Sequence, residues 1–266
     1  MKVDFIFDPG SSKEDSYLIK DNLFAVFDGF NGLEKFFDKE GVSGGLLAAN
    51  ISKEVFSQNN GTLESLAIKA NRKIRERAEE LNLDVNNKSK LWGTTLAAVK
   101  IKNGSFEWGS VGDSLVLVIF RDNSYKLLVE DYDHDGEVLA LWKKMAEKKE
   151  ENIAELILEP ITRLRAKVNE DYGALNGEDS AIKFLRMGEE SLQNVKTILL
   201  FTDGLFLPKE NPTDMDDWAL FTDIFLKGGL FKLKEYVRSL QIEDPKCWKY
   251  PRYKKHDDIT AISISL

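Results

Sequence analysis

Aspartates that directly follow apolar runs are the residues best suited to chemistry in this sequence. Asp28 and Gly29 come straight after the run Leu23–Phe27. Asp203, again followed by glycine, comes after Thr197–Phe201. A short apolar run bounded by turn residues predicts a buried strand, so each aspartate is expected at a strand end. Carboxylates held there, with a glycine that lets a ligand approach the main chain, are suited to binding a hard divalent cation.

The pattern recurs at two more places. Asp257 and Asp258 precede the strand-like segment Ile259–Ile264, and Asp113 separates two further strand-like segments. An Asp-Gly pair alone is usually only a turn, so the prediction depends on the recurrence. Several carboxylates brought into one cleft repel one another and are costly to desolvate, and a divalent cation relieves both effects. The sequence therefore predicts a metal site built from distant parts of the chain.

Composition narrows the class of protein. The 266 residues are enough for a sizeable core in a single domain, 1–266, and 42% hydrophobic with 31% charged residues is typical of a globular protein. The single cysteine, Cys247, excludes an intrachain disulfide and a thiolate metal cluster. A net charge of −8 argues against a general nucleic-acid binder. We expect a cytoplasmic protein with no membrane association, because no apolar run is long enough to span a bilayer and the N-terminus has no secretory pattern.

The order of elements predicts an α+β fold. The opening is expected to be a β-meander, and two helices follow, the second capped by Thr62. Hairpin turns then separate four strands, and the last third holds a strand, two helices and a final strand. We expect two antiparallel β-sheets packed as a sandwich with helices on the outside and the acidic strand ends at one rim. The expected strands are Lys2–Phe7, Tyr17–Ile19, Leu23–Phe27, Thr94–Ile101, Phe106–Val111, Leu115–Phe120, Tyr125–Val129, Thr197–Phe201 and Ile259–Ile264.

Residues 131–171 form the most irregular part of the sequence. The stretch is densely charged, carries one helical stripe that includes Val138 and Trp142, and contains Arg163 and Arg165. We predict a flap-like insert beside the site. His134 lies in a polar turn of this insert and is expected to be exposed.

Six short motifs, taken together and in order, resemble those of the metal-dependent serine/threonine protein phosphatases of the 2C type, bacterial members included. The resemblance covers nearly the whole chain. The motifs are Lys13-Glu14-Asp15-Ser16, Asp28-Gly29-Phe30-Asn31-Gly32, Gly93-Thr94-Thr95, Val111-Gly112-Asp113-Ser114, Thr202-Asp203-Gly204 and Asp257-Asp258-Ile259-Thr260.

The resemblance implies a four-layer α-β-β-α fold and a phosphatase that hydrolyses phosphoserine and phosphothreonine monoesters on proteins through a metal-activated water. It implies Mg²⁺ or Mn²⁺ as cofactor, with two core ions. Asp28 would bridge the two ions, and the carbonyl of Gly29 would contact one of them. Asp203 and Asp257 would hold the first ion and complete the catalytic centre with Asp28.

The resemblance also implies the outer metal ligands. Glu14 would hold the second ion through water, and Asp113 corresponds to the aspartate that holds a third, weaker ion in bacterial members. The sequence departs from the family's motifs in two respects. Phe30 stands where several members carry histidine. The arginine that often binds the substrate phosphate is missing, and Lys13 is the nearest cation in the opening motif.

Two other functions remain open at this point. A catalytically weak or inactive 2C-type relative would act as a binding or regulatory module. A phosphatase of the haloacid dehalogenase type would need a second aspartate two residues after Asp28, where Phe30 stands. Metal-dependent hydrolysis of p-nitrophenyl phosphate distinguishes an enzyme from a binding module.

Overall fold

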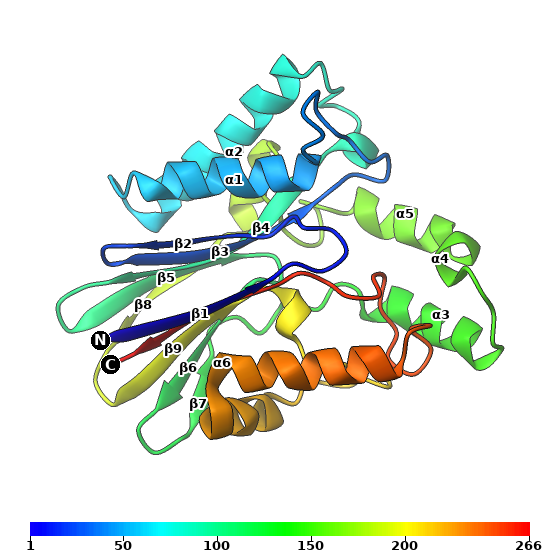
Figure 1. The fold of residues 1–266 in the computed structure, drawn as a ribbon. Helices are drawn as coiled ribbons and strands as arrows, with labels where there is room; N and C mark the ends of the chain where they lie inside the picture. The colour runs from blue at the N-terminus through cyan, green and yellow to red at the C-terminus, as the bar shows by residue number, and fades with distance from the viewer.

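The computed structural model describes every residue from Met1 to Leu266 and contains two five-stranded antiparallel sheets that face each other (Figure 1). The strands are β1 Lys2–Asp8, β2 Ser16–Lys20, β3 Leu23–Phe30, β4 Gly93–Ile101, β5 Ser105–Val111, β6 Leu115–Phe120, β7 Tyr125–Leu127, β8 Arg186–Ser191, β9 Val195–Phe201 and β10 Ile259–Ser265. One sheet has the order β1-β10-β9-β6-β7, and the other has the order β2-β3-β4-β5-β8. The expected α+β sandwich is confirmed.

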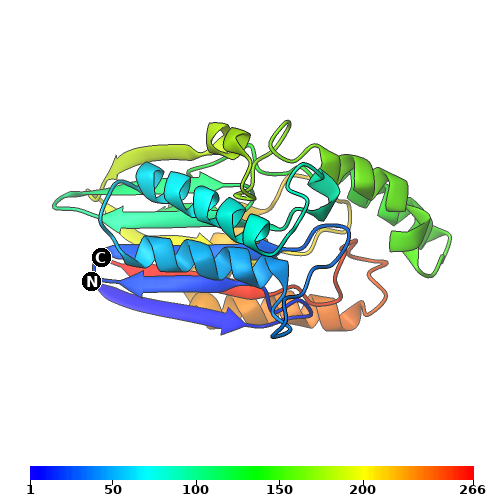
Figure 2. The same cartoon turned by 90° about the horizontal axis from the view of Figure 1, so that it is seen from above.

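Helices cover the outer faces of both sheets. The helices α1 and α2 lie over the sheet that contains β3, and α6 lies over the other sheet (Figures 1 and 2). The α-helices are α1 Gly44–Ser57, α2 Leu63–Glu80, α3 Gly136–Glu147, α4 Ile153–Leu156, α5 Leu158–Ala166 and α6 Trp218–Glu243. Three short 3-10 helices are η1 Lys88–Lys90, η2 Asp179–Phe184 and η3 Asp203–Leu205. No helix combines the length and apolarity needed to cross a bilayer.

Strand β3 is buried on both faces, which explains its continuous apolar sequence. Its side chains alternate between two cores, as the period of a strand requires. Phe24 and Val26 pack between the two sheets, whereas Leu23, Ala25 and Phe27 pack against α1 and α2. A strand fixed from both sides is a rigid support for the aspartate near its end.

Local signals set the boundaries of the helices. The hydroxyl of Ser43 accepts the backbone N–H of Leu46 at the start of α1, and the hydroxyl of Thr62 accepts that of Ser65 at the start of α2. The element α6 consists of two helical segments joined at Gly228 and Gly229, whose backbone is not helical, with φ +67° at Gly229, so the two helices expected near 215–225 and 230–240 are present.

The structure corrects the expected β-meander. Strand β1 does not pair with β2; it pairs with β10, with Lys2 opposite Ser265 and Asp8 opposite Ile259. The two termini therefore meet at one end of the sandwich (Figure 1). Asp257, two residues before the start of β10, lies at the opposite end of that strand. The local sequence does not specify this pairing, because it joins the two ends of the chain. Strand β8 was not expected, because its sequence is largely polar at an exposed sheet edge.

The insert 131–171 is largely helical, not irregular. Helices α3, α4 and α5 extend beyond the ends of the sheets (Figure 2) and share a small apolar core formed by Val138, Ile153, Ile157 and Trp142. The indole N–H of Trp142 donates to the backbone carbonyl of Cys247 at 2.8 Å. This bond ties the insert to the segment that follows α6.

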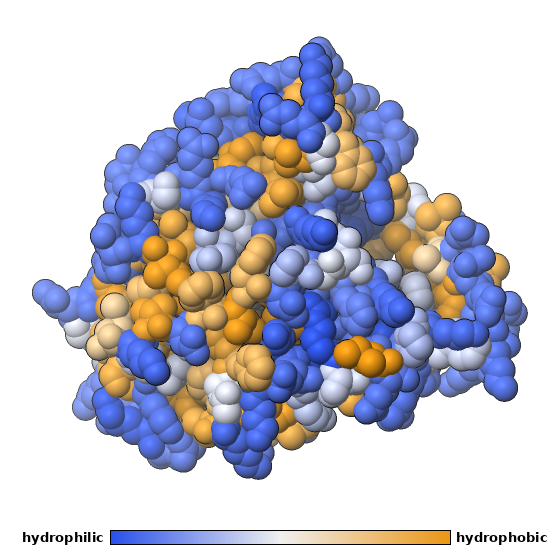
Figure 3. All heavy atoms as spheres, in the orientation of Figure 1, coloured by the Kyte–Doolittle hydropathy of each residue, from blue (hydrophilic) through white to orange (hydrophobic).

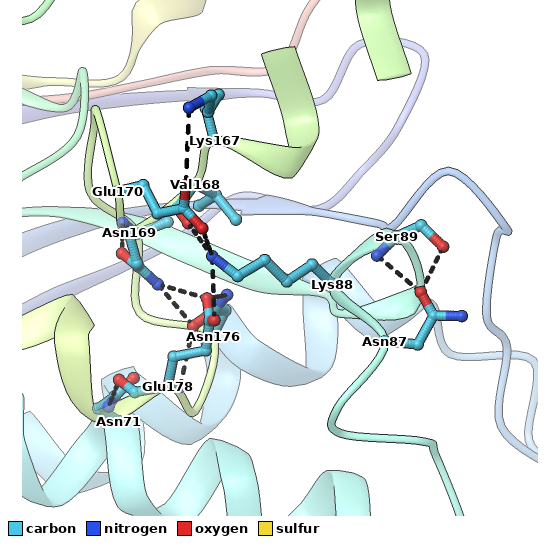
Figure 4. Close-up of polar contacts among 11 residues, drawn as sticks. Asn71, Asn87, Lys88, Ser89, Lys167, Val168, Asn169, Glu170, Asn176 and Glu178 are labelled. Carbon is cyan, nitrogen blue, oxygen red and sulfur yellow. Dashed lines mark hydrogen bonds and ion pairs between the residues drawn. The ribbon is translucent and has the colours of Figure 1, made fainter. Parts of the chain in front are cut away.

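A polar network anchors the C-terminal end of the insert to the body of the protein (Figure 4). The ammonium of Lys88 donates to the carbonyl of Val168 at 3.0 Å and to Glu170 at 2.9 Å. The amide of Asn169 donates to Asn176 at 2.8 Å. These contacts fix the chain beside η1, next to the rim where the aspartates lie.

One side of the sandwich carries exposed apolar residues. Figure 3 shows apolar surface among charged surface on the side where β1 and β2 lie. Phe5, Phe7 and Ile19 are exposed, and the ring of Phe5 stacks on Tyr17 with centroids 5.0 Å apart. This surface lies along the edge strands of both sheets.

Candidate active site

The four predicted aspartates come together at one rim of the sandwich. Asp28 lies in β3 opposite Thr95, and Asp203 begins η3, two residues after the end of β9. Asp257 lies just before β10, and Asp113 lies in the turn between β5 and β6. All four line one hollow of about 110 Å³. The strand ends that the sequence predicted therefore converge in space.

Negative charge in this hollow is incompletely balanced. Burial raises the pKa of Asp28, and the nearby carboxylates of Asp15 and Asp257 raise it further. Burial, followed by Asp28, Asp257 and Asp113, likewise raises the pKa of Asp203. One oxygen of Asp203 and one of Asp113 are buried without a hydrogen-bond partner. A cation would relieve both the repulsion and the unmet hydrogen-bonding capacity.

A lysine that the sequence analysis missed lies among these acids. The ammonium of Lys254 is 2.7 Å from an oxygen of Asp257. Burial alone would lower the pKa of Lys254, but the carboxylates of Asp257, Asp28 and Asp203 outweigh burial and raise it. Only its position three residues before Asp257 could have signalled this contact. As the side chains lie here, no group of three or more His, Cys, Asp or Glu residues is disposed to hold a metal ion.

Glu14 and Gly29 lie at the edge of the cluster. The Glu14 side chain is buried, accepts a hydrogen bond from the Asn31 amide at 2.7 Å and does not line the hollow. Burial raises its pKa. Gly29 passes so close to α1 that a Cβ there would lie 2.3 Å from the carbonyl oxygen of Gly45. Glycine is therefore required at this position for packing, whatever ligand its carbonyl contacts.

Two buried aspartates that were not assigned roles support the site. Asp258 accepts the backbone N–H groups of Gly10 at 2.6 Å, Lys13 at 3.0 Å and Glu14 at 2.6 Å. Asp15 is buried and accepts the hydroxyl of Thr202 at 3.0 Å. Each joins the opening motif to a motif from the second half of the chain.

The insert brings His134 to the site. His134 is only partly exposed and lines the hollow together with Asp28. Its Nδ1 is 3.1 Å from the carbonyl of Tyr132, so Nδ1 carries the proton, because a carbonyl only accepts. Its Nε2 is 4.0 Å from Asp113 and 3.6 Å from Asp135. An imidazole from the insert thus lies beside Asp113 and Asp135.

Basic residues of the insert lie around the entrance. The guanidinium of Arg165 is 5.4 Å from the centre of the Phe30 ring and lines the same hollow as Asp28. A larger hollow of about 670 Å³ lies beside it, between the insert and the sheet, and includes Arg163 and Arg186 in its lining. Lys13 is exposed and lines neither hollow. The cations that line the two hollows come from the insert (Arg163, Arg165 and Lys167), from η1 (Lys88), from β8 (Arg186) and from Lys254.

The residues present fit a hard divalent cation by their chemistry. The candidate ligands are all oxygen donors, and two of their buried oxygens have no partner. The side chains have not closed around a common point, since Lys254 is bound to Asp257.

Comparison with known proteins supports the resemblance seen in the motifs. The family model for protein phosphatase 2C matches residues 11–235. No curated protein sequence matches the chain. The structure is similar to the serine/threonine phosphatase PstP/Ppp of Mycobacterium tuberculosis, with 18% identity, a TM-score of 0.59, and 100% of this chain and 98% of that chain covered.

Two further solved structures have the same fold. Stp1 from Staphylococcus aureus, a serine/threonine phosphatase, is 17% identical with a TM-score of 0.60 over 100% of this chain and 94% of that chain. The catalytic domain of PstP in complex with two manganese ions is 16% identical with a TM-score of 0.58 over 98% of this chain and 96% of that chain. With a family model that matches most of its length, this chain belongs to the protein phosphatase 2C family.

Proposed function

We propose that this protein is a metal-dependent phosphatase that hydrolyses phosphoserine and phosphothreonine monoesters on proteins. The observation that carries the proposal is the convergence of Asp28, Asp113, Asp203 and Asp257 in one hollow, with buried carboxylate oxygens left without partners. Family membership supports it, as does the manganese reported for the PstP catalytic domain.

The residues that would hold Mg²⁺ or Mn²⁺ are those at the strand ends. Asp28, Asp203 and Asp257, with the carbonyl of Gly29, would hold the two core ions, Glu14 would support the second, and Asp113 would hold a weaker one. When bound, these ions would supply an activated water for attack on phosphorus and neutralise charge on the phosphoryl oxygens.

The chain's own residues around this centre bind and orient the substrate. Arg165, held over Phe30, offers a guanidinium to the phosphate at the entrance. The larger hollow beside the insert offers the cations of Arg163 and Arg186 to an acidic phosphopeptide. His134 presents Nε2 to the hollow, from where it can donate a hydrogen bond to the leaving oxygen when it carries a proton.

One observation favours the alternative of a weak or inactive relative that acts as a binding module. The ion pair of Lys254 with Asp257 uses a carboxylate that a core metal would need. Such a module would bind a phosphopeptide without hydrolysing it.

The test is hydrolysis of p-nitrophenyl phosphate and of a phosphothreonine peptide, with Mn²⁺ or with excess chelator. We expect turnover only with the metal, and loss of that turnover in Asp28→Asn. The matched control is Asp223→Asn, which removes one exposed carboxylate on α6 that pairs with Lys227. Turnover in excess chelator would contradict metal dependence. Phosphopeptide binding without any turnover in Mn²⁺ would establish the binding module.

A further inference from the structure

We propose that the ammonium of Lys254 is a tethered competitor of the divalent cation: it neutralises Asp257 in the metal-free protein and must leave when an ion binds. The proposal rests on the metal-dependent function proposed above. It concerns the affinity of the site for metal, which family membership does not address.

The contact uses the carboxylate that an ion would need. Lys254 Nζ lies 2.7 Å from Asp257 Oδ1, which also accepts the backbone N–H of Asp258 at 2.9 Å. Lys254 lines the same hollow as Asp28 and Asp203. Asp257 Oδ1 thus already accepts two hydrogen bonds, and a divalent ion on this carboxylate would repel the ammonium strongly at such a distance, so the ion and the ammonium compete for it. Binding of the ion therefore includes the cost of breaking this pair.

The Lys254 side chain has space to move away from Asp257. About a third of it, 32%, is exposed to solvent. It also lines a second hollow of about 180 Å³, whose lining includes Pro208 and Pro212 and which shares Asp203 and Asp257 with the first hollow. A flexible four-carbon stem can carry the ammonium from one hollow to the other or into water without any movement of the backbone.

The two arginines near Asp257 form ion pairs with carboxylates outside the cluster. Arg238 donates to the backbone carbonyl of Asp257 at 2.7 Å and pairs with Asp8 at 3.0 Å. Arg252 pairs with Asp244 at 2.9 Å. Lys254 is thus the one lysine or arginine that forms an ion pair with a carboxylate of the cluster, which makes it the specific candidate for competition.

The experiment measures Mn²⁺ binding directly, by calorimetry on the metal-free full chain at neutral pH. We expect Lys254→Met to bind Mn²⁺ about tenfold more tightly than the wild type, which corresponds to about 1.4 kcal/mol. Lys254→Arg, which keeps the positive charge, should stay near the wild type. Lys255→Met is the matched control, because it removes the neighbouring lysine, which is exposed. It should leave the affinity unchanged within about twofold.

A second readout is thermal unfolding in chelator. Lys254→Met should unfold at a lower temperature than Lys255→Met, because its carboxylates have lost their counter-ion, and saturating Mn²⁺ should remove the difference. If Lys254→Met fails to fold, Lys254→Gln takes its place in both measurements.

The outcomes separate this proposal from the proposed function. Equal or weaker Mn²⁺ binding by Lys254→Met would overturn the competitor role, and so would an equal gain in Lys255→Met. Absence of Mn²⁺ binding in both the wild type and Lys254→Met would overturn it as well. Tighter binding by Lys254→Met without phosphatase turnover would support the competitor role and count against the proposed function.

Discussion

The carboxylate of Asp258 accepts the backbone N–H of Glu14 at 2.6 Å, across 244 positions in the sequence. Its other oxygen accepts the N–H groups of Gly10 and Lys13. One buried side chain next to Asp257 therefore holds the loop that carries Glu14. A charged acceptor satisfies three backbone donors that would otherwise be unpaired at a sheet rim.

The first prediction concerns this contact. Asp258→Ala leaves the three N–H groups without their acceptor, so we expect the free energy of unfolding to fall by about 3 kcal/mol. Asp258→Asn keeps one acceptor oxygen, so its free energy of unfolding should fall by less. Chemical unfolding of the metal-free protein measures both. An alanine variant as stable as the wild type would show that water replaces Asp258 in this role.

The second prediction concerns Gly29. A Cβ at this position would lie 2.3 Å from the carbonyl oxygen of Gly45 and 2.5 Å from that of Glu14. Gly29→Ala should therefore lower the free energy of unfolding by about 3 kcal/mol or more, because main-chain atoms on both sides would have to move. Gly109→Ala is the control, since a Cβ there meets nothing closer than 3.7 Å. Equal stability losses in the two variants would contradict the packing argument.

The third prediction separates two leaving groups. A phosphoserine ester expels a poor leaving group, whereas p-nitrophenolate leaves without help. His134→Gln should lower kcat on a phosphoserine peptide about tenfold more than on p-nitrophenyl phosphate at saturating Mn²⁺. His256→Gln is the control, because His256 is bonded to Gln241 at 3.2 Å and lines neither hollow around Asp257. An equal fall in kcat on both substrates would indicate that His134 has only a structural role.

The fourth prediction is a pH dependence away from the site. Burial raises the pKa of Asp244, but the N–H groups of Tyr250 and Trp248 and the guanidinium of Arg252 outweigh burial and lower the pKa. A depressed pKa in the folded state means that the charged carboxylate stabilises the protein above the unfolded value of about 3.9. That stability is lost as the pH falls through the folded value.

Asp244→Asn should therefore cost about 2 kcal/mol at pH 7. The difference in the free energy of unfolding between this variant and the wild type should disappear as the pH falls below about 4. Urea unfolding of both proteins across this pH range measures the difference. A difference that stays constant to low pH would mean that the carboxylate's charge contributes nothing to the contact.

Much of the architecture was readable from local sequence. The apolar run of β3 and the caps at Ser43 and Thr62 follow from short-range physics: burial of apolar side chains and satisfaction of helix N–H groups. The prediction that Asp28 and Asp203 lie at strand ends followed from the same local patterns. The structure places Asp203 two residues after the end of β9, and Asp28 inside β3, two residues before its end at Phe30.

Tertiary structure decided what lies beside those aspartates. The pairing of β1 with β10, the bond from Glu14 to Asp258 and the approach of His134 to Asp113 all join segments far apart in the sequence or in separate elements. No local pattern encodes them, because each depends on which sheet faces which.

Lys254 is the clearest case in which the sequence alone did not predict the surroundings of a residue. The sequence places a lysine three residues before Asp257, a spacing that on most surfaces means a solvated ion pair of little consequence. Only the fold surrounds that pair with Asp28 and Asp203, whose carboxylates change its electrostatics. The sequence by itself determined which residues could carry the chemistry, because strands and caps form from local forces. The tertiary structure determined which charges face one another, because electrostatic interactions depend on distance in space and not along the chain.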